Sequence, residues 1–287
     1  APLNASGKVE FFADLFILAP LHRERANGAV LYDVNNRGNK LAVRFFNNGG
    51  GGNDPRELGD TGDGFLMKHG FIVVWSGWDG ELLPGGDRLR LHPPKASLNG
   101  QPIKGLVRCE LVPSDNSKRA VVVNWANHGS YRPSADGLAQ ATLTHRLLPT
   151  DPRQPIPRDE WKLLVSDVTS ESPNQLPKVE LEVATGLQKG HIYEVIYEAQ
   201  DPLVLGTSFT SVRDLIAAFK QGTGKNNPLL HEGRAVVQRA HAFGVSQSGR
   251  FLREFVYSGF NADEAGRRVF EGVIPHVSGS GMGSFNH

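Results

Sequence analysis

One serine lies in a short stretch whose residue types and spacing suit nucleophilic catalysis. Residues 243–249 read Phe-Gly-Val-Ser-Gln-Ser-Gly, with an apolar run before them and a helical pattern after them. A strand, a sharp turn that carries a serine, and a helix form the setting of a nucleophile elbow, in which the residues two before and two after the serine must be small. Gly244 and Ser248 meet this condition around Ser246, whereas a turn centred on Ser248 would place the bulky Arg250 there. We therefore predict Ser246 as the nucleophile; the alternative is an ordinary helix N-cap serine.

Acyl transfer at such a serine needs two backbone N–H groups that hold the developing oxyanion. One donor is expected from the residue after the nucleophile, Gln247, and the other from a loop that follows an earlier strand. The segment Leu41 to Phe46, which we predict as a strand, leads into four consecutive glycines. Glycine lets a substrate carbonyl approach the backbone closely. We expect the second donor at Gly49, Gly50 or Gly51; the alternative is a flexible turn.

Several polar and aromatic residues near predicted strand ends are candidates for a substrate pocket. Trp75, Trp78 and Asp79 follow the apolar run of residues 71–75, and ligand sites of α/β folds form at the carboxyl ends of strands. His276 follows a later predicted strand at residues 269–275. The alternative is that the tryptophans belong to the core and that His276 is a loop histidine.

The elements that would position these residues change in character along the chain. Residues 1–80 show strand, loop, helix and strand patterns, including an apolar run typical of a parallel strand buried on both faces. Residues 81–190 carry short strand patterns separated by Pro, Asp, Asn and Gly, which indicates a β-rich insertion. Residues 191–287 return to alternating strand and helix patterns, and we place the resumption of the α/β core at residues 192–197. We predict an α/β fold with a mostly parallel sheet and a β-rich insertion.

Composition and charge bear on which classes of binding partner and cofactor the protein could have. The 287 residues carry a formal net charge of +1, which gives no electrostatic argument for nucleic-acid binding. No apolar run reaches the ~18–20 residues of a membrane span. We expect no metal site, because no His, Cys and Asp grouping has ligand spacing, and no cofactor, because nucleotide-binding glycine motifs are missing. The start at Ala1 suits a secreted or periplasmic protein after signal-peptide cleavage, which we favour over a cytoplasmic one. The single cysteine, Cys109, fits the cytoplasm and also many exported bacterial proteins.

The sequence resembles the α/β-hydrolase superfamily, and is most similar to an uncharacterised bacterial group with an α/β-hydrolase domain and a long β-rich insertion. The stretches that carry the resemblance are residues 47–54, 70–80, 193–215 and 243–285. The resemblance implies a nucleophile at Ser246 and oxyanion donors at Gln247 and in the glycine loop.

That superfamily orders its triad as nucleophile, acid and histidine, and this chain departs from the pattern. After Ser246 come one helical pattern, one strand pattern and a glycine-rich tail, so we expect this chain to lack the C-terminal strands of the fold. Of the histidines in this part, His276 follows the strand and His287 is the last residue. We therefore expect a segment beyond residue 287, or a second chain, to supply the acid and the base.

The favoured function is that of a serine hydrolase that cleaves a small-molecule carboxylic ester through an acyl-enzyme at Ser246. The alternative is a binding or scaffold protein that uses a truncated hydrolase fold without turnover. Amide cleavage and acyl transfer would use the same elbow.

Overall fold

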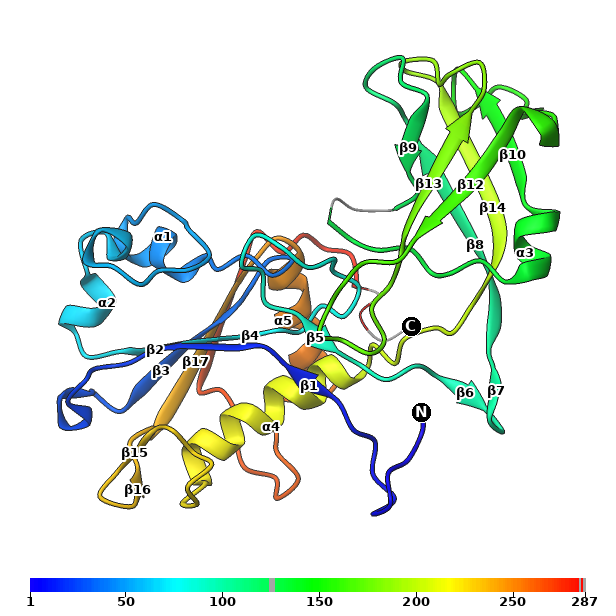
Figure 1. The fold of residues 1–287 in the computed structure, drawn as a ribbon. Coiled ribbons are helices and arrows are strands. Elements are labelled where there is room, and N and C mark those ends of the chain that lie inside the picture. Colours follow the sequence, from blue (N-terminus) through cyan, green and yellow to red (C-terminus); the bar gives the residue numbers. More distant parts are fainter. Residues whose placement is uncertain (124–126, 284, 286–287) are drawn as a thin grey trace. The chain divides into compact units, whose positions relative to one another are not determined.

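The chain forms two compact units in a computed structural model that describes residues 1–123, 127–283 and 285 (Figure 1). We call residues 11–80, 85–91 and 205–287 the α/β unit. We call residues 1–10, 81–84 and 92–204 the β-rich unit. Each unit has a hydrophobic core of its own, and each is described separately below.

A five-stranded sheet forms the centre of the α/β unit, in the order β18-β17-β3-β4-β2. Four neighbouring strands run parallel and β2 is antiparallel to β4. The strand bounds are β2 Leu15–Leu18, β3 Ala29–Val34, β4 Ile72–Ser76, β17 Arg239–Val245 and β18 Gly272–His276. The mostly parallel sheet predicted from the sequence is thus present in this unit.

Helices cover both faces of this sheet, which explains why β3 and β4 are apolar along almost their whole length. On one face, side chains of β3 and β4 pack against α4 (Thr207–Gln221) and α5 (Gln247–Tyr257). On the other face, they pack against α1 (Ala42–Asn47) and α2 (Phe65–Lys68). The strands are therefore held on both sides, and their carboxyl ends form a fixed edge.

The strand predicted at Leu41 to Phe46 is wrong, because Ala42–Asn47 forms the helix α1. The cause lies eight residues earlier in the chain. The carboxylate of Asp33, in β3, accepts the backbone N–H groups of Leu41 and Ala42, both at 2.6 Å. These are N–H groups at the start of the helix that have no acceptor within it. The four-glycine loop consequently follows a helix and not a strand.

The β-rich unit packs two antiparallel sheets around a single core. One sheet has the order β11-β10-β14-β8 and the other β12-β13-β9. Along β13 every second residue is buried, as expected for a sheet with one face in the core. The bounds are β8 Lys104–Leu111, β9 Arg119–Val121, β10 Thr142–Arg146, β11 Gln154–Pro155, β12 Trp161–Ser166, β13 Lys178–Val183 and β14 Ile192–Gln200.

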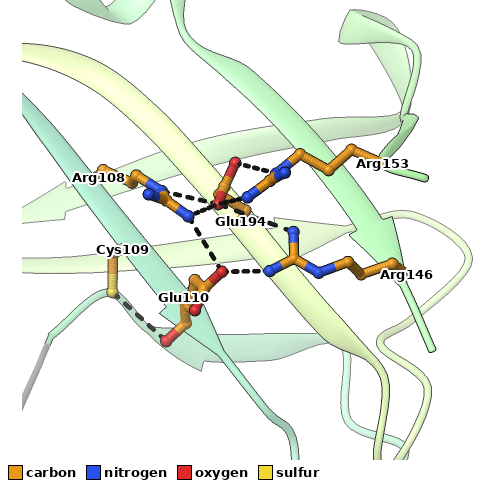
Figure 2. A network of polar contacts seen from close by, with 6 residues as sticks. All are labelled: Arg108, Cys109, Glu110, Arg146, Arg153 and Glu194. Carbon is orange, nitrogen blue, oxygen red and sulfur yellow. Dashed lines mark hydrogen bonds and ion pairs between the residues drawn. The ribbon is translucent and has the colours of Figure 1, made fainter. Parts of the chain in front are cut away.

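A network of charged side chains spans the first of these sheets (Figure 2). Glu194 of β14 has a side chain that is 5% exposed and accepts hydrogen bonds from Arg108 at 2.7 Å and Arg153 at 2.8 Å. Glu110 of β8 accepts from Arg146 of β10 and lies 3.3 Å from Arg108. Both oxygens of the buried Glu194 carboxylate are thereby matched with guanidinium groups, as buried charges require.

The strand β14 belongs to this β-rich sheet, although the sequence analysis placed residues 192–197 at the resumption of the α/β core. Its neighbours β8 and β10 pair with it in antiparallel register along its length. The main segment of the β-rich unit consequently runs from residue 92 to residue 204, and the α/β unit resumes at residue 205. The sequence pattern of residues 192–197 alone did not distinguish a strand of the parallel sheet from a strand of an antiparallel sheet.

The remaining elements are short. They are β1 Phe12–Ala13, β5 Leu91–His92, β6 Ser97–Leu98, β7 Gln101–Pro102, β15 Leu230–His231, β16 Arg234–Ala235, α3 Ala135–Gln140, and the 3-10 turns η1 Arg23–Arg25, η2 Leu58–Thr61 and η3 Arg158–Glu160. Among the described residues, no helix combines the length and the apolar character needed to cross a bilayer.

Candidate active site

Ser246 occupies a strained turn between β17 and α5. Its backbone has φ 56° and ψ −111°, a combination that L-amino acids rarely adopt. Its side chain is exposed, while the residues on either side in β17 and α5 are largely buried. A strained backbone of this kind persists only where the surrounding structure holds it, and such positions are concentrated at functional sites.

Close packing between the strand and the helix explains the small residues of the turn. A Cβ atom on Gly244 would lie 2.5 Å from the carbonyl oxygen of Ser248, and a Cβ on Gly249 would lie 2.8 Å from that of His276. Both distances are far shorter than van der Waals contact. The requirement for small residues thus falls on Gly244 and Gly249, in addition to the fully buried Ser248.

The peptide group that joins Val245 to Ser246 is hydrogen-bonded at both ends. The Ser246 N–H donates to the carbonyl of His276 at 3.0 Å. The Val245 carbonyl accepts from the side chain of Asn36 at 2.8 Å and from the hydroxyl of Ser248 at 3.0 Å. The Ser248 hydroxyl also accepts the Val245 N–H at 2.8 Å. The turn is therefore fixed by groups from β17, β18, α5 and the residues after β3.

The start of α5 is oriented toward the same turn. Ser246 holds the N-cap position, but its hydroxyl makes no capping hydrogen bond, which separates it from an ordinary N-cap serine. Gln247 is the first helical residue, so its backbone N–H has no acceptor within the helix. The N-terminus of a helix also carries partial positive charge. Both features favour an oxyanion next to Ser246.

The glycine loop has a clear structural role at the end of α1. Asn48 ends the helix in the left-handed region at φ 52°, and Gly49 donates its N–H to the carbonyl of Val43 at 3.1 Å. A Cβ on Gly49 would lie 2.6 Å from a methyl carbon of Val43. Gly50 and Gly51 are exposed, and Gly51 has φ 78°. Helix termination thus accounts for Gly49 and a positive φ accounts for Gly51, while a Cβ added to Gly50 would meet no atom within 4 Å.

The loop directly after β3, which was not among the residues predicted for the site, reaches the elbow. Asn36 and Asn39 exchange backbone hydrogen bonds at 2.9 and 3.0 Å, with Arg37 at φ 49° and Gly38 at φ 80° between them. This is the geometry of a type I′ turn. The side-chain bond from Asn36 to Val245 brings the turn against the nucleophile strand. The letters Asn-Arg-Gly-Asn show the turn but not its partner, 209 residues away.

Asp33 is a second residue that the sequence analysis did not single out. Its side chain is fully buried, and burial raises its pKa to about 6, although hydrogen bonds from Leu41, Trp75 and Ala42 act against this shift. All three hydrogen bonds go to one carboxylate oxygen, with Trp75 Nε1 at 2.5 Å. An acidic residue inside an apolar strand was the signal available in the sequence.

The residues predicted to line a pocket are distributed over both faces of the sheet. Trp75 is buried with the α1 and α2 side chains, whereas Trp78 is buried against Phe251 of α5, at 4.7 Å between ring centroids. Trp78 donates its Nε1 hydrogen to the carbonyl of Asn35 at 2.6 Å. Asp79 is 6% exposed. The two tryptophans thus contribute to separate clusters of the core.

His276 lies at the elbow through its backbone and against aromatic rings through its side chain. Its carbonyl accepts the Ser246 N–H, and its ring lies 5.7 Å from that of Phe45 and 6.5 Å from that of Phe243. The residue is exposed. The structure therefore brings His276 close to Ser246 in the sheet register, where Val245 pairs with His276.

A shallow hollow of about 670 Å³ lies elsewhere in the α/β unit. Asp214, Ala217 and Gln221 of α4 line it together with Asp263, Glu264 and Arg267 from the connection before β18. None of these residues belongs to the elbow. The hollow is therefore separate from the candidate active site.

Comparison with known proteins gives a family match for the C-terminal part of the chain. Residues 180–287 match the model of a family described as an alpha/beta hydrolase domain. No curated protein and no solved structure matches the chain. The matched segment contains β17, the Ser246 turn, α5 and β18. Through this segment, the chain is similar to the α/β-hydrolase superfamily.

Proposed function

We propose that the protein is a serine hydrolase that cleaves a carboxylic ester through an acyl-enzyme at Ser246. In the first step, the hydroxyl oxygen of Ser246 attacks the ester carbonyl carbon while a base takes the hydroxyl proton. The tetrahedral intermediate then expels the alcohol, which receives that proton. In the second step, water attacks the acyl-enzyme in the same way and releases the carboxylic acid, which restores the free serine.

The observation that carries this proposal is the backbone of Ser246 at φ 56° and ψ −111°, with an exposed side chain that caps nothing. An ordinary N-cap serine has an extended backbone and binds the first turn of its helix. Ser246 does neither, and close contacts at Gly244 and Gly249 hold the strand and the helix together around it. These features support a nucleophile better than a structural serine.

The oxyanion would be held first by the N–H of Gln247 at the start of α5. For the second donor, we retain the loop with Gly49, Gly50 and Gly51 as the proposal. The residues after β3 are a competing source, because Asn36 from this loop is hydrogen-bonded to the elbow. Esters are the favoured substrate class because an alcohol leaves a tetrahedral intermediate more readily than an amine does.

The reaction also needs a base and an acid, which the hydrogen bonds of the elbow do not identify. We propose that residues outside the elbow, in this chain or in a second chain, supply them. His276 is the competing candidate for the base because its backbone is bonded to Ser246. If His276→Ala keeps most of the activity, the base comes from elsewhere, whereas a loss as large as that of Ser246→Ala would assign the role to His276.

Hydrolysis of p-nitrophenyl esters with acyl chains of graded length tests the proposal in the complete protein. We expect turnover by the wild type and a loss of about 10³-fold or more in Ser246→Ala. Ser258→Ala is the matched control, because Ser258 is an exposed serine at the other end of α5. Equal rates in the wild type and Ser246→Ala would contradict the proposal and favour a binding or scaffold protein.

A further inference from the structure

We infer that Asn36 and Ser248 are positioning residues that clamp the Val245 carbonyl and thereby hold Ser246 in its strained conformation. The inference rests on the proposed function, because it assigns these two residues a role in presenting the nucleophile. Neither residue is assigned contact with the substrate.

Two donors from different elements meet on one carbonyl oxygen. Asn36, in the turn after β3, donates from its side-chain Nδ2 to the Val245 carbonyl oxygen at 2.8 Å. Ser248, in the first turn of α5, donates from its hydroxyl to the same oxygen at 3.0 Å. The N–H at the other end of this peptide group is bonded to the carbonyl of His276 in β18. The plane of the peptide before Ser246 is thus fixed from three directions.

This fixation matters because φ of Ser246 depends on the orientation of that plane. A residue with φ 56° relaxes toward negative φ unless its neighbours prevent the rotation. Rotation of the preceding peptide would break the bonds to Asn36 and Ser248. The clamp therefore opposes the motion that would turn the Ser246 side chain away from the N-terminus of α5.

Asn36 is itself held rigidly, so it can transmit this constraint. Its backbone forms both bonds of the type I′ turn with Asn39, and β3 pairs with β17 up to the partners Val34 and Gly244. The nucleophile is in this way tied to the neighbouring strand and to its own helix.

The chain offers a matched pair of variants. Asn36→Asp keeps the shape of the side chain but replaces the donor on Val245 with an anionic acceptor. Asn39→Asp makes the same chemical change in the same turn and removes bonds to the carbonyls of Asn36 and Arg37, while the contact with Val245 remains.

The first measurement is amide hydrogen exchange at Ser246 in the full chain near pH 8, with the Ala242 amide of β17 as internal reference. For Asn36→Asp we expect exchange at Ser246 to rise by about 10-fold relative to Ala242, the effect of one lost hydrogen bond. For Asn39→Asp we expect the ratio to stay at its wild-type value. An unchanged ratio in Asn36→Asp, or an equal rise in both variants, would overturn the inference. This readout does not depend on catalysis.

The second measurement is the rate at which a fluorophosphonate labels Ser246. We expect Asn36→Asp to lower this rate by about 10-fold or more, with Asn39→Asp near the wild type. Ser248→Gly, which retains a small residue, should lower it less because it removes a donor without placing an anionic acceptor beside the Val245 carbonyl. The double variant should lose more than the product of the two single effects, since each donor partly replaces the other. Strictly multiplicative losses would overturn the shared clamp.

The two measurements separate the inference from the proposed function. A wild type that resists labelling, with faster Ser246 exchange in Asn36→Asp, would overturn the hydrolase proposal and leave the clamp supported. A wild type that is labelled, with unchanged exchange and labelling in Asn36→Asp, would support the hydrolase and overturn the clamp.

Discussion

At the scale of single residues, Ser246 and Asp33 show which roles can be predicted from the sequence and which depend on the folded chain. The prediction of Ser246 as a nucleophile rests on local evidence: the small neighbours and the strand and helix patterns lie within a few residues of it. Asp33 was not singled out because its partners Leu41 and Trp75 lie 8 and 42 residues away. Its role as the acceptor for the start of α1 exists only in the folded chain.

Asp33→Asn should remove a pH dependence of stability. Burial raises the pKa of Asp33 to about 6 in the folded protein, above the value of ~3.9 for an unfolded chain. The folded state therefore binds more protons between these values, and its stability decreases as pH rises from about 4 to above 6. Asparagine can still accept the N–H groups of Leu41, Ala42 and Trp75 but does not ionise.

We expect the stability of Asp33→Asn relative to the wild type to rise by about 2–3 kcal/mol between pH 4 and pH 7. Urea unfolding of both proteins at these two pH values measures the difference. Parallel stability curves would show that the ionisation of Asp33 is not linked to folding.

At the scale of secondary-structure elements, the type of most segments followed from local patterns, and α1 shows where this failed. Residues 41–46 are too few for apolar spacing to distinguish a short strand from a short helix. The deciding group was the Asp33 carboxylate in the preceding strand. The donor expected in a loop after a strand was consequently placed in a loop after a helix, and the Asn36 turn was overlooked.

One methyl group added at Gly244, where β17 meets α5, should destabilise the protein. In Gly244→Ala, the new Cβ would lie 2.5 Å from the Ser248 carbonyl oxygen, so the backbone has to move. We expect a loss of about 1–3 kcal/mol of stability, together with slower labelling of Ser246. Gly224→Ala is the control, because no atom lies within 4 Å of its added Cβ, and its stability should change by less than about 0.5 kcal/mol. Equal stability of the two variants would contradict the close packing of the elbow.

Glu194, in β14, should contribute to the stability of the folded protein in a pH-dependent way (Figure 2). Hydrogen bonds from Arg153 and Arg108 hold the pKa of this carboxyl below its ordinary value, although burial acts in the opposite direction. A lowered folded pKa stabilises the protein above the unfolded value of ~4.3, and this stabilisation is lost as pH falls through the folded value.

Glu194→Gln should therefore cost roughly 1.5–3 kcal/mol at pH 7, the range for hydrogen bonds to charged groups. The difference from the wild type should become smaller below about pH 4. Denaturant unfolding at both pH values provides the measurement, and a difference that grows toward low pH would contradict the assignment.

At the scale of the whole molecule, the sequence indicated both an α/β part and a β-rich part, and the structure contains two units of these kinds. Their limits along the chain could not be predicted well. Whether residues 192–197 belonged to a parallel or an antiparallel sheet depended on β8, more than 80 residues earlier, since Tyr193 pairs with Leu111 and Tyr197 with Val107. Such long-range pairing leaves no local signal beyond the alternation that both sheet types share.

The central claim is that Ser246 is an activated nucleophile, and covalent labelling of the complete protein tests it most directly. The wild type and Ser246→Ala are treated with a fluorophosphonate, and the modified peptide is identified by mass spectrometry. We predict one adduct on Ser246 in the wild type and none in Ser246→Ala. A wild type without an adduct, or an adduct on another residue that persists in Ser246→Ala, would contradict the claim.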